Sequence, residues 1–230
     1  MFTGFPEETI RFFLELSFHN DAAFFESHRQ DYENYVRKPF YDFIDAMAPT
    51  VRQVADDMDM RPAKCLARIR RDTRFTKDKT PYRDHMWLLF RRGGEERSTS
   101  AMYWFELSPR EVEWGLGFWD NNRPAMDALR RHMREKPDEV MRVLADARVP
   151  DTGLDVYGQR YGRMGTPPEL PQQLKELYPL RELYIKRTGV PLKVAYTSQI
   201  TELFAADLLR LAPVYRLLRK AADEGMGAEP

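Results

Sequence analysis

Apolar and polar residues follow a helical period at both ends of the chain and a strand period in its centre. In the N-terminal part, apolar residues recur every three to four positions, which predicts helices over about 6–16, 21–36 and 39–58. Pro49 lies inside the third segment. Because proline removes a helical hydrogen bond, we expect a kink or a division of that helix there.

The central part changes to the two-residue period of strands. Four segments show it: KCLARIRRD (64–72), HMWLLF (85–90), SAMYWFEL (100–107) and EVEWGLGF (111–118). The last two flank Pro109–Arg110, which predicts a hairpin turn. We therefore expect an antiparallel sheet of about four strands.

The helical period returns after the sheet, with interruptions by proline and glycine. Helices are predicted over about 124–134, 137–148, 172–178, 200–211 and 214–222, with an extended stretch near 183–187. Residues 150–171 read as a long ordered loop, a length that is uncommon without a function. Because helices and strands are segregated, we predict the α+β class, with the sheet packed against N-terminal and C-terminal helices. The expected organisation is a single domain over 1–224 and a disordered tail over 225–230.

The predicted hairpin places two carboxylates opposite each other. A turn at Pro109–Arg110 pairs Glu106 with Glu113 and puts Phe105 and Trp114 on the other, apolar face. Like charges in this position are unfavourable unless a cation, a proton or water lies between them. The face of the carboxylates also carries Met102, Trp104, Gly115 and Gly117, and strand glycines can mark the close approach of a ligand or another side chain. The alternative is a solvated face on which the tryptophan covers the glycines.

The charge of the chain is balanced overall and polarised locally. Lys and Arg together number 36, as do Asp and Glu, so a general electrostatic attraction to nucleic acid is not expected. Residues 61–85 hold nine Arg or Lys against three Asp, so this segment is at +6 and the remainder at −6. The polarity indicates a local site and not an adhesive surface.

Several classes of protein are disfavoured by simple features. The single Cys65 excludes an internal disulfide and a Cys-rich zinc cluster, and we expect it to be a buried thiol. The four histidines show no metal-binding spacing, so no metal site and no particular cofactor is predicted. The N-terminus lacks the features of a signal peptide, and no apolar run approaches the roughly 18 residues of a membrane span. We expect a cytoplasmic protein without a membrane partner.

The run RIRRDTRFTKDKTPYRDH, residues 68–85, holds the densest chemistry. Thr80 and Pro81 suit the start of a helix, where free N–H groups and the helix dipole favour an anion. Cations surround this position, and arginine offers bidentate contacts to phosphate or carboxylate. The candidate ligand-binding residues are Arg68, Arg70, Arg74, Lys77, Lys79, Thr80, Tyr82, Arg83 and Trp104. Arg68 and Arg70 could also reach the face of Glu106 if their segment joins the sheet.

Three interpretations of this run remain open. The first is a binding site for a phosphorylated or carboxylate small molecule, which would also allow hydrolase or transferase chemistry. His85 is the candidate general base, and Asp72, Glu106 and Glu113 are candidate partners. The second is a nucleic-acid or protein-interaction surface, because Tyr82 and Trp87 interleave with the cations; nucleic acid is the less favoured partner, and we expect weak binding. The third is a purely structural Arg/Asp network.

The same run resembles the signature of a widespread family of conserved hypothetical proteins from bacteria and fungi. Members carry a block much like R-x-Y-R-D-T-R-F-S-K-D-K-T-P-Y-K-x-H. Upstream, NDAAFFESHRQDYENY is similar to the family's N-N-x-x-W-F-x-x-N-K-x-x-Y-E, and downstream LLRLAPVYRLLRKA is similar to its C-terminal helix.

The resemblance covers nearly the whole chain and implies a single domain of unknown function. It marks Arg74, Lys77, Lys79, Tyr82 and His85 as the signature, and it implies no particular reaction. This chain departs from the family at His28, where members often have Asn, and at Arg29, where they have Lys. A later Leu-Lys-Arg-Pro-Pro element appears here as QRYGRMGTPP.

Overall fold

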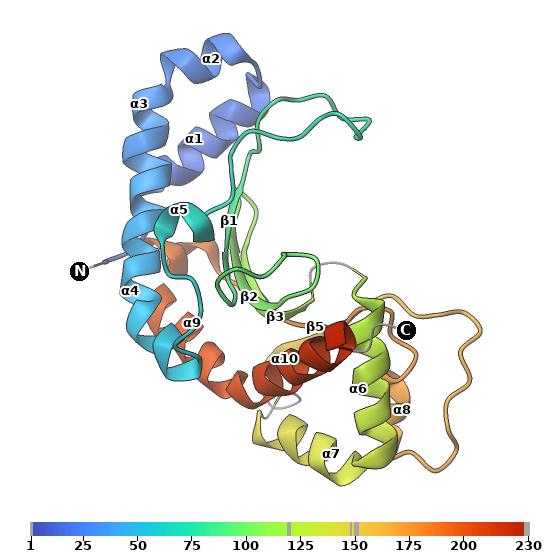
Figure 1. The fold of residues 1–230 in the computed structure, drawn as a ribbon. Coiled ribbons are helices and arrows are strands. Elements are labelled where there is room, and N and C mark those ends of the chain that lie inside the picture. The colour runs from blue at the N-terminus through green and yellow to red at the C-terminus, as the bar shows by residue number, and fades with distance from the viewer. Residues whose placement is uncertain (1, 119–120, 148, 150–151, 228–230) are drawn as a thin grey trace. The chain divides into compact units, whose positions relative to one another are not determined.

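The N-terminal helices are shorter and more numerous than the periodicity predicts. In the computed structural model, which describes residues 2–118, 121–147, 149 and 152–227, this block has six elements (Figure 1). They are α1 (Glu7–Phe18), α2 (Ala22–Ser27), α3 (Arg29–Asp31), the π-helical η1 (Tyr32–Arg37), α4 (Lys38–Val54) and α5 (Pro62–Cys65). The predicted second helix is thus three consecutive pieces, and His28 between the first two has a non-helical backbone (φ −111°, ψ 18°).

Pro49 does not divide α4, so of the two expected outcomes, a kink or a division, the division was wrong. The helix continues through it to Val54 as one element. Val51 and Val54, which follow the proline, are buried at 0% and 6% exposure. Packing of the same apolar stripe on both sides of Pro49 therefore holds the helix together, because tertiary contacts supply most of the stability of a helix in a protein.

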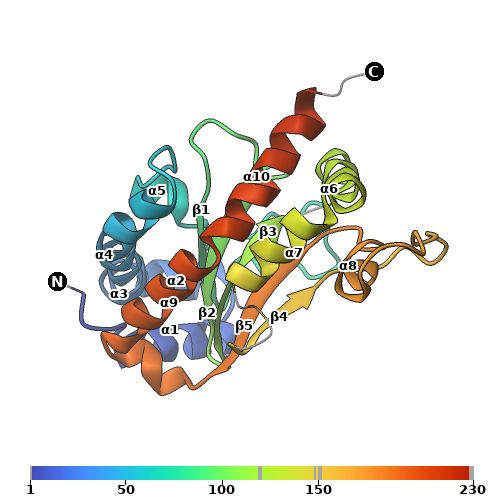
Figure 2. The same cartoon turned by 90° about the horizontal axis from the view of Figure 1, so that it is seen from below.

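The sheet has five antiparallel strands, so the α+β class is confirmed and the expected number was one too few. Its strands are β1 (Met86–Phe90), β2 (Ala101–Leu107), β3 (Val112–Phe118), β4 (Leu154–Tyr157) and β5 (Tyr184–Val190), in the order β1-β2-β3-β5-β4 (Figure 2). Two of these strands were not among the four expected: β5 covers the extended stretch predicted near 183–187, and β4 lies inside the segment 150–171 that was expected to be a loop. β4 pairs with β5 from Leu154–Arg187 to Tyr157–Tyr184.

The predicted strand at 64–72 is not a strand, and this is a second correction. Its first residues belong to α5, which Pro62 begins at a favourable first helical position. The following residues form only isolated bridges, Leu66 with Leu88 and Arg70 with Tyr82. Cys65, at the end of α5, is buried as predicted.

The C-terminal block follows the predicted helices closely. It contains α6 (Arg123–Glu135), α7 (Pro137–Asp146), α8 (Gln172–Leu177), the 3-10 helix η3 (Leu192–Tyr196), α9 (Gln199–Arg210) and α10 (Ala212–Gly227). α10 packs against α6 (Figure 2). At Gly225 a Cβ atom would lie 2.6 Å from the carbonyl carbon of Pro124, so the glycine permits this close packing. Residues 225–227 are thus helical where a tail was expected, and 228–230 lie outside the described residues.

The chain divides into two compact units, which we describe separately. Unit 1 comprises Met1–Phe90, Trp104–Trp114 and Thr188–Ala206. Unit 2 comprises Arg91–Tyr103, Gly115–Arg187 and Asp207–Pro230. Each unit takes residues from separate stretches of the chain, so no single point in the sequence separates them. The single domain over 1–224 stays a prediction.

The hairpin in unit 1 has its two faces as predicted. Phe105 and Trp114 are 0% and 1% exposed, and their rings stack with centroids 6.2 Å apart. Glu106 and Glu113 are half-buried and point away from this core. The N–H of Ser108 donates to the carbonyl of Glu111 (3.0 Å) and closes the turn at the predicted position. The core of unit 1 is aromatic: Phe5, Phe40, Phe43, Phe90, Phe105, Trp114 and Phe204.

In unit 2, a neighbouring segment of the chain explains why residue 117 of β3 is a glycine. A Cβ atom on Gly117 would lie 2.4 Å from the carbonyl oxygen of Leu183 and equally close to the Cβ of Tyr184. The close approach that the sequence indicated is therefore that of protein backbone, and it requires no ligand.

Candidate functional site

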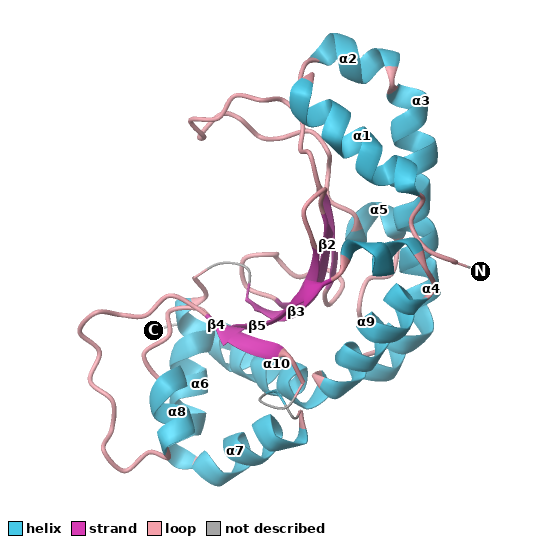
Figure 3. Cartoon of the chain, turned by 180° about the vertical axis from the view of Figure 1, so that it is seen from behind, coloured by secondary structure: helices cyan, strands magenta, loops and turns pink. Residues whose placement is uncertain are grey.

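The basic run forms a two-stranded arm, which we define as residues 66–88. The N–H of Arg71 donates to the carbonyl of Pro81 (2.8 Å), and the N–H of Arg83 donates to that of Ile69 (2.9 Å). These bonds join the segments 66–71 and 81–88, and residues 72–80 form the tip (Figures 1 and 3).

The helix that was predicted to begin at Thr80 and Pro81 does not form. None of the described residues 79–85 is helical. Instead, the side chain of Asn20 clamps the backbone of Tyr82: its amide nitrogen donates to the carbonyl (2.9 Å), and its oxygen accepts from the N–H (3.0 Å). The Tyr82 ring is buried and stacks on Phe25, with centroids 4.2 Å apart. These tertiary contacts keep the segment extended and override the local capping signal, so the anion site expected at a helix start is absent.

Salt bridges near the tip bind two arginines to neighbouring carboxylates. Arg74 pairs with Asp72 (2.7 Å) and lowers the pKa of that carboxyl group to about 2. Arg71 pairs with Asp78, whose pKa is also below its usual value because Thr80 donates backbone and side-chain hydrogen bonds to it. These contacts fold the tip onto itself.

Two further cations bind backbone carbonyls. Lys79 Nζ donates to the carbonyl of Thr73 (2.8 Å). Arg83 Nη1 donates to the carbonyls of Arg68 and Arg70 (2.8 Å each), and its guanidinium lies over the Trp87 ring, 4.5 Å from the centroid. Burial lowers the pKa of Arg83. Lys79 and Arg83 therefore stabilise the arm, as the structural interpretation predicts.

Arg68, Arg70 and Lys77 differ from these cations. Their side chains are exposed, and within the described residues none of the three forms an ion pair or a side-chain hydrogen bond. Arg68 and Arg70 are two positions apart, on either side of the buried Ile69. Their positive charges are therefore accessible to a negatively charged ligand.

Arg68 and Arg70 line a groove of about 330 Å³ in unit 1. Tyr32, Arg37 and Tyr41 form its other polar wall. The remaining lining residues are Ala63, Leu66, Ala67 and Ile69. The sequence allowed the two arginines to lie on the sheet face of Glu106. In the structure they line this groove together with residues of η1 and α4.

Arg37, the third arginine of the groove, already has an ion-pair partner. Arg37 donates to both oxygens of Glu33 (2.8 and 2.9 Å) and to the hydroxyl of Tyr41 (3.4 Å). Burial raises the pKa of Tyr32 to about 12, so its hydroxyl is neutral at physiological pH. The groove is thus lined by two arginines without ion-pair partners in the described residues, by two tyrosines and by apolar side chains.

His85 lies in a bulge of the arm. Leu66–Arg70 faces Tyr82–Leu88, so the second segment carries two more residues, and the chain bends at Asp84 and His85. Such bulges re-aim side chains. Here Nδ1 of His85 lies 3.0 Å from Oδ1 of Asp84, and Nε2 lies 4.0 Å from Oε1 of Glu106. The imidazole stacks on Trp87 and is 31% exposed, so it can exchange protons with solvent or with a ligand.

The other candidate residues are distributed over unit 1. Asp72 is in the tip, bonded to Arg74, and does not belong to the cluster of Asp84, His85 and Glu106. Glu113 and Trp104 are half-buried on β3 and β2. The structure thus joins Glu106 to His85 and separates the groove arginines from both.

Sequence reasoning missed the residues that η1 and α4 contribute. Tyr32, Arg37 and Tyr41 lie about thirty positions before the arm, and their helical spacing gives no sign of a groove. The sequence did mark Asn20 as a residue of interest, because the upstream segment that resembles the family begins with it. Its role as a clamp depends on a residue 62 positions away.

The sequence matches the family described as conserved hypothetical protein (DUF2461) over residues 8–216. This chain belongs to that family. The DUF2461 match includes the arm, the groove and the His85 cluster. A comparison with curated proteins found no match.

Two further findings concern metal ions and membrane spans. Among the residues that the structure describes, no three His, Cys, Asp or Glu side chains form a group that could hold a metal ion. Within the same residues, every helix is too short or too polar to cross a membrane.

Proposed function

We propose that this protein binds an anionic small molecule, phosphorylated or carboxylate, in the groove beside the arm. The observation that supports this best is the pair Arg68 and Arg70. Both line the groove, and neither has an ion-pair partner in the described part of the chain. Two neighbouring guanidinium groups repel each other, and a bound anion would relieve that repulsion.

The chemistry of the groove suits such a ligand. Arginine binds phosphate and carboxylate through two parallel hydrogen bonds. The hydroxyls of Tyr32 and Tyr41 can add hydrogen bonds, while Ala63 and Ile69 offer apolar contact. A volume of about 330 Å³ is at the lower end of small-molecule sites, which favours a compact ligand.

Hydrolysis or transfer of a group from the bound molecule needs a residue that accepts a proton. His85 suits this role because it lies between two carboxylates and is accessible to solvent. It does not line the groove, so the reacting group would have to extend from the groove to reach it. Asp84 orients the imidazole through Nδ1, which leaves Nε2 on the side of Glu106.

A second candidate function is contact with nucleic acid or protein through the tip. Phe75 favours it, because this aromatic side chain is 89% exposed and the guanidinium of Arg74 lies over its ring. Aromatic side chains beside cations provide stacking platforms for single-stranded nucleic acid. The third reading, a structural arm, is favoured by the internal contacts of Arg71, Lys79 and Arg83.

The test compares two double variants that each remove two positive charges from the arm. Arg68→Ala/Arg70→Ala alters the groove, and Arg74→Ala/Lys77→Ala alters the tip. Thermal unfolding is followed with and without phosphate, sulfate, nucleotides and dicarboxylates. An anion at 100 times its Kd should stabilise the wild type by about 2.7 kcal/mol. We expect the groove variant to lose this stabilisation and the tip variant to keep it, while each substitution by itself costs within about 0.5 kcal/mol.

Two results would contradict the groove proposal. One is a wild type that no anion stabilises; the other is an equal loss of stabilisation in both variants. Nucleic-acid contact is tested with a fluorescent single strand, for which we expect weak binding. Sub-micromolar binding in physiological salt, with a steep salt dependence that Phe75→Ala weakens, would favour the tip instead.

A further inference from the structure

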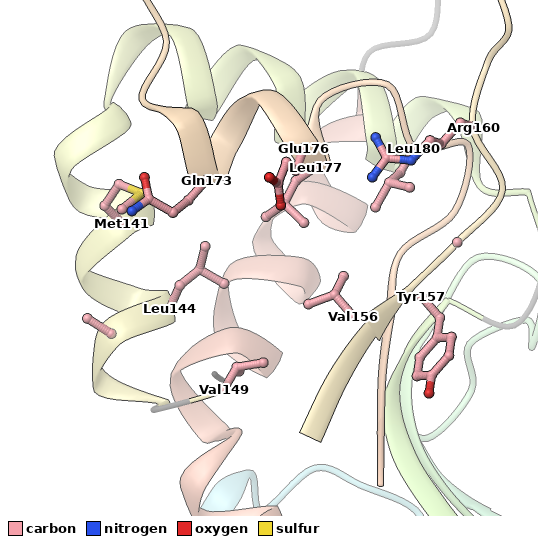
Figure 4. A pocket seen from close by; sticks show the side chains of 12 residues that line it. Met141, Leu144, Val149, Val156, Tyr157, Arg160, Gln173, Glu176, Leu177 and Leu180 are labelled. Atoms are coloured by element: carbon pink, nitrogen blue, oxygen red, sulfur yellow. The ribbon is translucent and has the colours of Figure 1, made fainter. Parts of the chain in front are cut away.

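Unit 2 contains a large apolar pocket built from its own residues. Its volume is about 660 Å³, within the range of small-molecule sites (Figure 4). The apolar lining comes from α7, from β4 and from the region of α8. These side chains include Met141, Leu144, Ala145, Val156, Leu177 and Leu180.

The apolar lining remains partly open to solvent. Val156 is 37% exposed, and Met141 and Leu144 on α7 are only half-buried. Leaving such surface in contact with water is unfavourable, and clustered apolar surface of this kind marks interaction sites. An apolar ligand that covers these side chains would gain the free energy of their burial.

Besides Tyr157, three polar side chains line the pocket: Arg160, Gln173 and Glu176. In the described part of the chain, none of them has a hydrogen-bond or ion-pair partner for its side chain. The two charges are opposite. In Figure 4, Glu176 and Gln173 extend from α8, and Arg160 extends from the segment that follows β4.

The backbone fixes Arg160 in place. Arg160 forms an isolated β-bridge with Leu180. Backbone hydrogen bonds lie on both sides of it. The N–H of Arg181 donates to the carbonyl of Gln159 (2.7 Å), and the N–H of Tyr161 donates to the carbonyl of Pro179 (2.9 Å). The guanidinium is therefore presented by a segment that is already ordered, which reduces the entropic cost of binding a ligand.

We infer that this pocket binds an apolar molecule that carries both an anionic and a cationic group, the chemistry of apolar amino acids and short apolar peptides. The carboxylate of such a ligand pairs with Arg160, and its ammonium group pairs with Glu176. The amide of Gln173 can hydrogen-bond to a peptide group. A fatty acid would satisfy Arg160 but would bring its negative charge near Glu176, which disfavours it.

The first experiment measures binding of the dipeptide Leu-Phe to the full chain by calorimetry. Three ligands of similar apolarity serve for comparison: acetyl-Leu-Phe, which lacks the cation; Leu-Phe-amide, which lacks the anion; and decanoate. We expect Leu-Phe to bind tightest, by about tenfold or more over each comparison ligand. No binding of Leu-Phe, or tighter binding of decanoate, would overturn the inference.

Variants then assign each charge. Arg160→Gln should abolish the preference for Leu-Phe over Leu-Phe-amide, and Glu176→Gln should abolish the preference over acetyl-Leu-Phe. Leu144→Trp, which fills the pocket, should abolish binding. Arg163→Gln is the matched control, because Arg163 is an exposed arginine three residues from Arg160 and does not line the pocket. Preferences that survive both charge variants, or a control that loses them, would overturn the inference.

Discussion

Unit 1 contains two regions that use the same kinds of side chains in opposite ways. In the aromatic core, Phe43 and Phe105 are fully buried and stack among other rings. In the arm, Phe75 is 89% exposed, and the contacts that shape the tip are hydrogen bonds and ion pairs between exposed groups. Burial therefore determines the first region, and local polar contacts determine the tip of the arm.

This difference predicts how the two regions divide stability and function. Removing apolar surface from water is the main source of folding free energy, whereas exposed ion pairs contribute little because water competes for them. The core should carry the stability of unit 1. The tip can then vary its charges at low cost, and the proposed anion-binding role of Arg68 and Arg70 would likewise require little of the stability of unit 1.

The largest contrast is expected between two phenylalanines. Phe105→Ala should lower the free energy of unfolding by about 3 to 5 kcal/mol, because it leaves a cavity among the rings of Phe5, Phe43 and Phe204. Phe75→Ala should change it by less than about 0.5 kcal/mol. Urea denaturation of both variants measures the difference. Similar losses of unfolding free energy in the two variants would show that Phe75 is packed in solution, and would contradict the contrast between core and tip.

Tyr32 tests whether the wall of the groove belongs to the core. Burial raises its pKa from 10.0 to about 12, so the folded state favours the neutral phenol. Its contribution is complete below pH 10 and is lost as the pH rises to about 12, an effect of roughly 2 to 3 kcal/mol. Urea denaturation from about pH 9 to pH 12 should show a shallower decline for Tyr32→Phe than for the wild type. Identical declines would contradict the burial of this hydroxyl.

Asn20 joins the two regions, so its effect should lie between theirs. Asn20→Ala leaves the backbone groups of Tyr82 without their partners and should cost about 1 to 3 kcal/mol. Hydrogen exchange at the Tyr82 amide should become faster. Asn34→Ala is the control, because Asn34 is exposed and bonds only to the exposed Gln30. Unchanged exchange at Tyr82 would mean that the arm holds its extended shape without the clamp.

The smallest effect is expected at the tip. Asp72→Asn removes the partner of Arg74, but both side chains are exposed, so the midpoint of urea denaturation should not change measurably. The pKa of about 2 predicts that this pair stays ionised in mild acid. A loss as large as that of Asn20→Ala would show that the tip is part of the folded core.

Local patterns determined much of the fold. The alternation around Pro109–Arg110 placed Phe105 in the core, because the side chains of a strand alternate strictly between its two faces. The position of α8 followed from spacing in the same way. The composition of the segment 61–85 located a cluster of cations, several of which are exposed in the structure.

Tertiary structure decided what the local signals could not. Thr80 and Pro81 favour a helix start, but the contacts of Tyr82 with Asn20 and Phe25 hold the chain extended, because several long-range contacts outweigh one cap. β4 forms within a segment of loop composition because β5 supplies its hydrogen-bond partners. The groove depends on the same cause: η1 and the arm are distant in sequence, so only folding brings Arg37 opposite Arg68.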